Sequence, residues 1–292
     1  MSVVIETENL CRTYKTYQKP EGLWQSVQGL WNRKYTEKLA LASTNLKIES
    51  GKIVGLVGAN GAGKTTLLKM LSGLIYPSSG TASVLGYKPW ERNNAFLKRM
   101  SILLGQKNQL WWDISPMDSY SLLIEIYDLV PEKARQRIRE LAELLDCKHV
   151  LDTQLRRLSL GERMKMELIG ALLHEPEILF LDEPTIGLDI VAQGTIRKFL
   201  SEYVKQRGPT VILTSHYMDD IARLADQLLL ISKGSIVYNG TVESFMQKSQ
   251  LKQKLIFSLM EPLTSNVVLS ENHILTAGTQ EYEISLNPEE LP

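Results

Sequence analysis

The sequence predicts an α/β fold whose central sheet is built from parallel strands. The segments Ile53–Val57, Ile178–Leu181 and Val211–Leu213 are apolar throughout, as expected of strands that are covered on both faces. The first runs into a glycine-rich loop and a helix-forming segment, and the second ends in two acidic residues. Because ligands of such sheets bind at the carboxyl ends of strands, the two acids are predicted to point toward the glycine loop.

The glycine-rich loop has the pattern G-x-x-x-x-G-K-[ST] in the strand–loop–helix context that this pattern requires. It consists of Gly58, Ala59, Asn60, Gly61, Ala62, Gly63, Lys64, Thr65 and Thr66. Glycines let the backbone N–H groups turn inward around a polyphosphate, and the following helix adds its positive dipole end. Lys64 is expected to reach the β- and γ-phosphates, and the Thr65 hydroxyl to hold Mg²⁺. The alternative is a turn that merely links a strand to a helix.

The composition excludes several classes of function. Of the 292 residues, 43% are hydrophobic, which is ordinary for a globular protein with a full core. Lys plus Arg and Asp plus Glu each number 33, so no overall field attracts nucleic acid or an anionic membrane. No apolar run approaches the roughly 18 residues of a membrane-spanning helix. Cys11 and Cys147 have no metal-ligand spacing and are expected to remain reduced thiols.

The N-terminal part begins with a predicted strand at Val3–Ile5, and Tyr14 follows it closely. Tyr14 has two interpretations: an aromatic ring that stacks on a nucleobase, or an ordinary residue on a strand face. Strand-like alternation resumes at Leu39–Gly51, before the strand that precedes the glycine loop.

Between these strands, residues 18–38 are predicted to form an amphipathic helix. One stripe of it holds Leu23, Trp24, Val27, Leu30 and Trp31, at helical spacing. Tryptophans flanked by cations favour a helix that faces a membrane surface or a partner. The alternative is a helix that packs on its own domain.

A helical block is predicted between the glycine loop and the two acids. Ser115-Pro116 has the pattern of an N-cap with proline at the first helical position, opening a helix through about Leu129. Glu132–Asp146 is amphipathic and forms a second helix. Ser159–Glu162 is a capping box, S-x-x-E, that opens a helix ending before Pro176. The free N–H groups of its first turn make a second possible anion site, although this pattern alone usually marks only a helix cap.

The strand at 178–181 ends in Asp182 and Glu183, and the strand at 211–213 ends in Thr214-Ser215-His216. Residues 228–232 and 236–238 flank a glycine turn and predict a hairpin. Beyond Gly240 the signals weaken to one helix at 241–253 and short strands near 255–259 and 267–269.

Taken in order, these motifs resemble the ATP-binding subunit of an ABC transporter over about residues 3 to 240. The matching segments are the glycine loop 58–65, a glutamine-loop residue at Gln106, L-S-L-G-E at 158–162 for the signature, F-L-D-E-P at 180–184, G-L-D at 187–189 and the switch histidine His216. One departure is clear: Leu160 stands where the signature usually has a first glycine, and Glu162 stands for the usual glutamine. A leucine still offers its backbone N–H to a phosphate if its φ is helical.

The resemblance implies a P-loop NTPase fold of the ABC cassette type, a RecA-like core with an antiparallel β subdomain and a helical subdomain. The ATP-binding domain would span 1–240, with the helical subdomain at about 107–165, and 241–292 would form a small C-terminal extension. The variant signature and the inserted N-terminal helix resemble bacterial exporters with a type-2 permease, a group that includes sodium-extrusion and daunorubicin-export ATPases.

The resemblance also implies a reaction, ATP hydrolysis, with Mg²⁺ as the cofactor. Asp182 would hold the metal ion and Glu183 would position or deprotonate the attacking water. His216 would contact the γ-phosphate, and Gln106 would join the metal to the helical block. Tyr14 would stack on the nucleobase.

The implied partners are a membrane permease and a second ATP-binding subunit, identical or different, that meets this chain head to tail. Ser159 and Gly161 of one chain would complete the ATP site of the other, and Asp189 would lie in the dimer-contacting loop. The protein would then act at the cytoplasmic face of the cell membrane, without nucleic acid, and its transported substrate would be recognised by the permease.

Two other function classes compete with a transporter motor. A soluble ABC ATPase that acts on ribosomes or nucleic acid usually carries two cassettes or a long coiled coil, whereas this chain has one cassette and no heptad run. A nucleotide-sensing module without catalysis is disfavoured by the intact Asp182–Glu183 pair and by His216.

Overall fold

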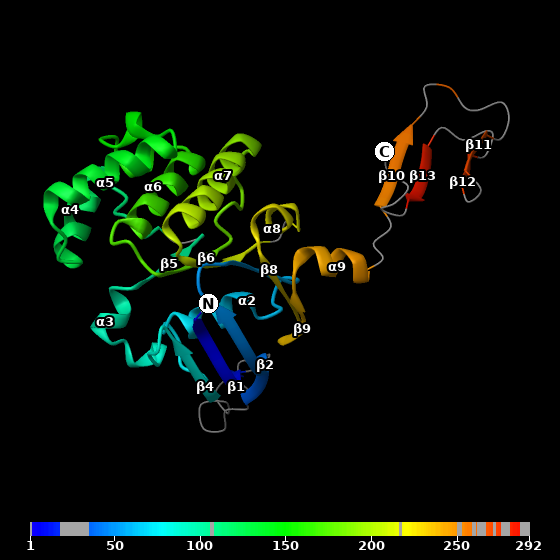
Figure 1. Ribbon diagram of the computed structural model, residues 1–292, viewed down its shortest axis with the longest axis horizontal. Helices are drawn as coiled ribbons and strands as arrows, with labels where there is room; N and C mark the ends of the chain where they lie inside the picture. The colour runs from blue at the N-terminus through cyan, green and yellow to red at the C-terminus, as the bar shows by residue number, and fades with distance from the viewer. Residues whose placement is uncertain are drawn as a thin grey trace, which may run out of the picture. The chain divides into compact units, whose positions relative to one another are not determined.

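The structure, a computed structural model, describes residues 2–17, 35–105, 108–215, 218–249, 253–258, 261, 267–270, 273–275 and 281–286. The chain divides into two compact units, Met1–Val242 and Glu243–Pro292 (Figure 1). The predicted site residues Gln106 and His216 lie outside the described residues.

The first unit is built on a six-stranded sheet with strand order β5-β6-β7-β3-β8-β9. Its strands are β3 (Ile53–Val57), β5 (Met100–Leu104), β6 (Ile178–Asp182), β7 (Thr210–Thr214), β8 (Gln227–Ser232) and β9 (Ser235–Gly240). All neighbouring pairs are parallel except β8 and β9, which form the predicted antiparallel hairpin. Every residue of β7 is buried, which explains why its segment Val211–Leu213 is apolar throughout.

A second, antiparallel sheet has the order β2-β1-β4. It consists of β1 (Val3–Tyr17), β2 (Tyr35–Glu49) and β4 (Ser79–Val84). Of the helix predicted at 18–38, residues 18–34 lie outside the described residues. The predicted helix is wrong for its last four residues. They belong to β2, where Tyr35–Lys38 pair with Tyr14–Tyr17. The apolar stripe that motivated the helix ends at Trp31, so nothing in 35–38 opposes the strand.

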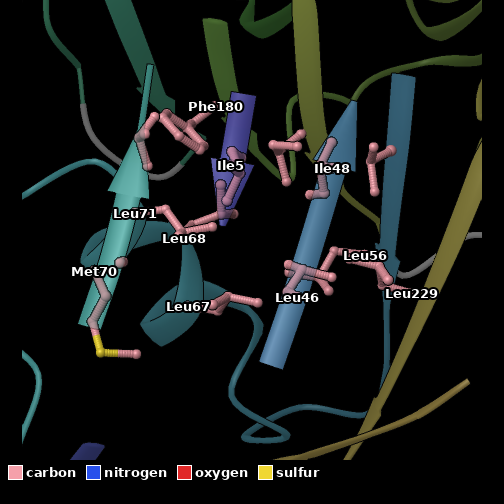
Figure 2. Close-up of a cluster of buried hydrophobic side chains, with 14 of the residues drawn as sticks. Ile5, Leu46, Ile48, Leu56, Leu67, Leu68, Met70, Leu71, Phe180 and Leu229 are labelled. Atoms are coloured by element: carbon pink, nitrogen blue, oxygen red, sulfur yellow. The ribbon is translucent and has the colours of Figure 1, made fainter. Parts of the chain in front are cut away.

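The helix that follows the glycine loop, α2 (Lys64–Leu71), packs among both sheets. Figure 2 shows Leu67, Leu68 and Leu71 of this helix in one cluster with residues of the two sheets. The cluster also includes Ile5, Leu46 and Ile48 of the antiparallel sheet and Leu56, Phe180 and Leu229 of the parallel sheet. Burial of each such side chain stabilises the fold by about 1.5–3 kcal/mol. The start of α2, and with it the glycine loop, is thereby fixed between the sheets.

The remaining helices of this unit are α3 (Asn94–Leu97), α4 (Pro116–Ile126), α5 (Pro131–Leu144), α6 (Leu160–Leu172), α7 (Ile190–Arg207) and α8 (Met218–Leu224), with short 3₁₀ turns at Pro89–Glu91, Lys148–Val150 and Leu155–Arg157. Figure 1 shows α4, α5 and α6 grouped together, away from the antiparallel sheet. Ser115 caps α4 as predicted, in a capping box with Asp118. The helix ends earlier than Leu129 because Asp128 has a left-handed φ of 56°.

The second unit follows β9. Helix α9 (Val242–Ser249) begins at the boundary between the units. Further along, β10 (Gln253–Ser258) pairs with β13 (Glu281–Leu286), and β11 (Val267–Ser270) pairs with β12 (His273–Leu275), both antiparallel. Among the residues that the structure describes, no helix combines the length and the apolar character needed to cross a membrane.

Candidate functional site

The glycine loop joins β3 to α2 through a backbone that admits no side chain at two positions. A Cβ atom at Gly58 would lie 2.2 Å from the carbonyl oxygen of Ile231, and one at Gly63 would lie 2.5 Å from that of Ala40. Gly63, the N-cap of α2, also has a left-handed φ of 115°. Because glycine alone tolerates both the φ and the close approach, the loop is held in shape before any ligand binds.

Lys64 is the first residue of α2 and is 5% exposed. Its Nζ donates to the carbonyl oxygens of Gly58 (2.7 Å) and Ala59 (3.2 Å). The ammonium therefore lies against the loop at the positive end of a helix, where an anion is stabilised. A polyphosphate in this loop would meet both the N–H groups and the Lys64 charge.

Asp182 ends β6 next to the glycine loop. Its Oδ1 accepts hydrogen bonds from the hydroxyls of Thr65 (3.1 Å) and Thr214 (2.8 Å). The structure thus brings two of the three residues predicted at the metal, Thr65 and Asp182, into direct contact; the third, Gln106, lies outside the described residues. A carboxylate and a hydroxyl oxygen are the hard ligands that Mg²⁺ prefers, together with phosphate oxygens. The residues present fit that ion.

Glu183 follows directly and has a left-handed φ of 56°. Its backbone N–H donates to Thr214 Oγ1 at 2.9 Å. A non-glycine residue in this region is strained by about 1–3 kcal/mol, and such strain concentrates at functional sites. The strained turn sets the direction in which the carboxylate leaves the end of the strand.

Gly105 anchors the end of β5 beside these acids. Its N–H donates to the carbonyl oxygen of Asp182 at 2.9 Å. A Cβ atom at Gly105 would lie 2.6 Å from the carbonyl oxygens of both Asp182 and Glu183. Gly105 therefore fixes this end of β5 to the strand that carries the acids.

The predicted signature, residues 158–162, includes Ser159, the N-cap of α6. The Glu162 N–H donates to Ser159 Oγ (3.3 Å), and Glu162 Oε2 accepts from the Ser159 N–H (2.9 Å) and hydroxyl (2.7 Å). This confirms the predicted capping box. The hydrogen bond from the Ser159 hydroxyl is the main reason that the pKa of Glu162 is lowered.

Gly161 brings the signature against the loop at Asp189. A Cβ atom at Gly161 would lie 2.9 Å from Cβ of Ala192 and 3.8 Å from Asp189 Oδ2. Asp189 caps α7, and its Oδ1 accepts from the Ala192 N–H at 2.9 Å. In the described part of this single chain, no hydrogen bond joins Ser159 to the glycine loop. The two anion sites are thus separate within one chain.

Tyr14 lies on β1, opposite Lys38 of β2. The Arg12 guanidinium carbon is 4.6 Å from the centre of the Tyr14 ring, a cation–π contact. The predicted strand at Val3–Ile5 is longer in the structure and includes Tyr14. Arg12 is a neighbour that the sequence pattern did not indicate.

Two residues of the site escaped the sequence analysis as functional groups. Thr214 contacts both acids, and its only sequence signal was a hydroxyl at the carboxyl end of a buried strand. Asp220 is 2% exposed and accepts from the hydroxyls of Thr185 (2.7 Å) and Ser215 (3.2 Å), besides an ion pair with Arg197. Asp220 therefore ties the segment before His216 to the segment after Glu183.

Comparisons with known proteins agree with this geometry. The family described as "ABC transporter" matches residues 41–186. The chain is 30% identical over 228 residues to the ABC transporter ATP-binding protein NatA of Bacillus subtilis, covering 78% of this chain and 92% of that protein. It is 34% identical over 211 residues to the daunorubicin resistance ATP-binding protein DrrA3 of Streptomyces coeruleorubidus, covering 72% and 66%.

Two further comparisons extend these matches. The Nod factor export ATP-binding protein I of Burkholderia orbicola is 31% identical over 215 residues, covering 74% of this chain and 70% of that protein. Among solved structures, the ATP-binding cassette MJ0796, a dimer bound to ADP and Pi, matches with a TM-score of 0.68 at 21% identity, covering 82% of this chain and 98% of that one. At that identity the likeness concerns the fold, which is the predicted cassette of a P-loop NTPase.

Proposed function

Because this chain belongs to the ABC transporter family and is an ATP-binding, ATP-hydrolysing motor subunit, we propose that it powers a bacterial exporter through the site described above. The observation that carries the proposal is the meeting of Thr65, Asp182 and Thr214 beside the glycine loop, with hydrogen bonds of 3.1 and 2.8 Å. It supports a cation site and a strained glutamate beside the loop that would bind the phosphates. Hydrolysis needs all three features at one place.

The residues have separate roles in the proposed reaction. The loop N–H groups and Lys64 bind the phosphates of ATP, and Tyr14 stacks on the base. Thr65 and Asp182 would hold Mg²⁺, which neutralises phosphate charge when bound. Glu183 positions the attacking water and accepts its proton. The hydrogen bond from its backbone N–H to Thr214 fixes the turn that carries this carboxylate. By their places in the motifs, Gln106 is assigned to joining the metal to the helical block, and His216 to the γ-phosphate.

We further propose that two such subunits share each ATP. In the part of the chain that the structure describes, the N-terminus of α6, with Ser159 and Gly161, has no hydrogen bond to the glycine loop, and it is suited to an anion. In a head-to-tail dimer it would approach the γ-phosphate bound by the other chain, with Asp189 beside it. Closure on ATP and opening after hydrolysis would then act as a population shift.

The transport step requires a separate permease, and we place this chain against it at the cytoplasmic face of the cell membrane. Export is favoured by relatives whose names state resistance to daunorubicin and export of Nod factor. In this proposal residues 1–240 are the ATP-binding domain, residues 107–165 its helical subdomain, and 241–292 an extension. The substrate would be selected by the permease, and no nucleic acid takes part.

The decisive test is Glu183→Gln. The change keeps the size of the side chain but removes the base, so hydrolysis should fall by about 10²–10⁴-fold while ATP still binds. Phosphate release at steady state measures the first effect and binding of a fluorescent ATP analogue the second. Hydrolysis near the wild-type rate would contradict the role of Glu183.

Lys64→Ala is the matched control, because it removes charge from the phosphate site rather than the base. It should weaken ATP binding itself. Copurification of the wild-type chain with an integral-membrane protein tests the transporter role, and copurification with ribosomes or nucleic acid instead would overturn it.

A further inference from the structure

One buried carboxylate lies next to the candidate site without a role in it. Glu167 is in the middle of α6 and is 4% exposed. Among the described residues, no Lys, Arg or His lies within ion-pair distance of its side chain. Burial raises its pKa, against the lowering effects of the hydrogen bonds that it accepts and of the more distant charge of Arg163. Burying a carboxylate without a cation at ion-pair distance destabilises the fold unless hydrogen bonds compensate for the lost hydration. The contacts of Glu167 therefore need an explanation.

Those contacts are with the backbone of one short segment. The Gln109 N–H donates to Glu167 Oε1 (3.0 Å) and Oε2 (3.1 Å), and the Leu110 N–H donates to Oε1 at 3.2 Å. The segment has no helix or strand of its own to satisfy these N–H groups. Glu167 therefore fixes residues 109 and 110 to α6. The point of attachment, Glu167, lies eight residues after the cap residue Ser159.

The same stretch of chain is fixed to the parallel sheet at its other end. The Gly105 N–H, just before Gln106 in the sequence, donates to the backbone carbonyl oxygen of Asp182 in β6 at 2.9 Å. The Gln109 side chain also donates to the Ile102 carbonyl of β5. A cavity of about 270 Å³ lies between the two attachments, lined among others by Gly105, Asn108, Arg163 and Glu167. The bonds to Glu167 thus cross from the sheet side to the helical block.

We propose that Glu167 is a positioning residue for ATP hydrolysis: it holds the segment after Gln106 against the signature helix, so that this segment and the Ser159 end of α6 keep one relative position. The inference rests on the proposed function, in which Gln106 and Ser159 both face ATP. A helix transmits a displacement along its length, because its backbone hydrogen bonds are continuous from Glu167 to Ser159. Without the carboxylate, the two N–H groups would lose the link to α6.

Two substitutions separate the hydrogen bonds from the charge. Glu167→Met keeps the length of the side chain and removes both oxygen acceptors. Glu167→Gln removes the charge but keeps Oε1, the atom that accepts from both N–H groups. A matched control is Tyr120→Phe, since the Tyr120 hydroxyl is fully buried and donates to the Met166 carbonyl of α6 at 2.8 Å, but from α4. Tyr120→Phe removes a buried hydrogen bond to Met166, the neighbour of Glu167 in α6, but keeps the hydrogen bonds of residues 109 and 110.

The full chain is examined by hydrogen exchange and by steady-state ATPase kinetics. In Glu167→Met, amides of the peptide 105–112 should exchange about tenfold faster. Its kcat should fall about tenfold, because small displacements of positioned groups are costly in rate, while KM for ATP changes less than about twofold. Glu167→Gln should restore most of kcat. Tyr120→Phe should keep both kcat and the exchange of this peptide.

Three results would overturn the proposal: a kcat of Glu167→Met within about twofold of wild type, an unchanged exchange of 105–112, or an equal loss of kcat in Tyr120→Phe. The last would show a merely structural role. If Glu167→Met does not fold, Glu167→Ala replaces it, because the adjacent cavity can admit water to the freed N–H groups. If the wild-type chain does not hydrolyse ATP, both the proposed function and the positioning role of Glu167 are overturned. If the wild-type chain hydrolyses ATP and Glu167→Met has the same kcat, only the positioning role is overturned.

Discussion

At the scale of single residues, one hydroxyl group organises both acids of the site. Thr214 is fully buried, donates to Asp182 Oδ1 at 2.8 Å and accepts from the Glu183 N–H at 2.9 Å. Its donor and one acceptor position are therefore both used. The hydroxyl fixes the carboxylate that would hold the metal ion and the backbone of the residue that would accept the proton.

Thr214→Val is expected to damage catalysis more than its small change in shape suggests. Valine leaves the Glu183 N–H without its partner, which should lower the free energy of unfolding by about 1–3 kcal/mol. A denaturant titration measures that loss, and kcat should fall while ATP binding is kept. Thr214→Ser retains the hydroxyl and is the control. Equal kcat in Thr214→Val and wild type would show that the hydroxyl does not position the acids.

At the scale of elements, local signals predicted most of the fold. Two parallel strands were identifiable because burial on both faces makes their central segments continuously apolar, as in 178–181 of β6 and 211–213 of β7. The helix starts at Ser115 and Ser159 were identifiable because a cap is a contact between residues three apart. The end of the helix predicted at 18–38 was wrong because β2 begins at Tyr35 through pairing with β1, a distant segment.

The residues that the sequence did not indicate act across long separations. Thr214 reaches Asp182 from 32 residues away, and Glu167 reaches Gln109 from 58 residues away. Neither contact follows from a motif or a period, because each depends on which strands and helices become neighbours. The glycine loop, Asp182 and Glu183 were predictable since loop pattern and strand ends are local. Their assigned roles, with those of Gln106 and His216, stay predictions.

The cap of α6 gives a pH-dependent prediction. The pKa of Glu162 is lowered in the folded chain, chiefly by the Ser159 hydroxyl. Its carboxylate therefore stabilises the fold above the ordinary pKa of 4.5, and that contribution is lost as the pH falls through the lowered value. Glu162→Gln keeps a capping partner without the charge, so it should be less stable by about 0.3–1 kcal/mol at neutral pH.

The measurement is the free energy of unfolding of both chains at neutral pH and at a pH well below the ordinary glutamate pKa. The difference between them should shrink in acid. A difference that stays constant over the whole range would show that the Glu162 charge does not support the cap.

At the scale of the whole molecule, the arrangement of the two anion sites predicts complementation between chains. Ser159→Arg blocks the signature and Lys64→Ala blocks the glycine loop, so neither variant should hydrolyse ATP alone. Each mixed dimer would hold one complete site, built from the loop of one chain and the signature of the other. Random mixing should restore about a quarter of the wild-type rate.

The control for this mixing is a chain that carries both Lys64→Ala and Ser159→Arg. Combined with Ser159→Arg chains it offers no intact signature, so the rate should stay at background. Absence of recovery in mixed dimers whose composition is verified by mass spectrometry would count against a shared site.

The left-handed backbone at Glu183 has a consequence for the history of such a chain. A φ of 56° suits asparagine or glycine better than glutamate. Replacing Glu183 by either residue would therefore raise the stability of the fold. In the proposed function, the demand for hydrolysis opposes that change, as in other trade-offs between stability and activity. In a duplicated gene released from that demand, position 183 is therefore where drift should first replace the ancestral residue, well before the packed leucines of α2 change.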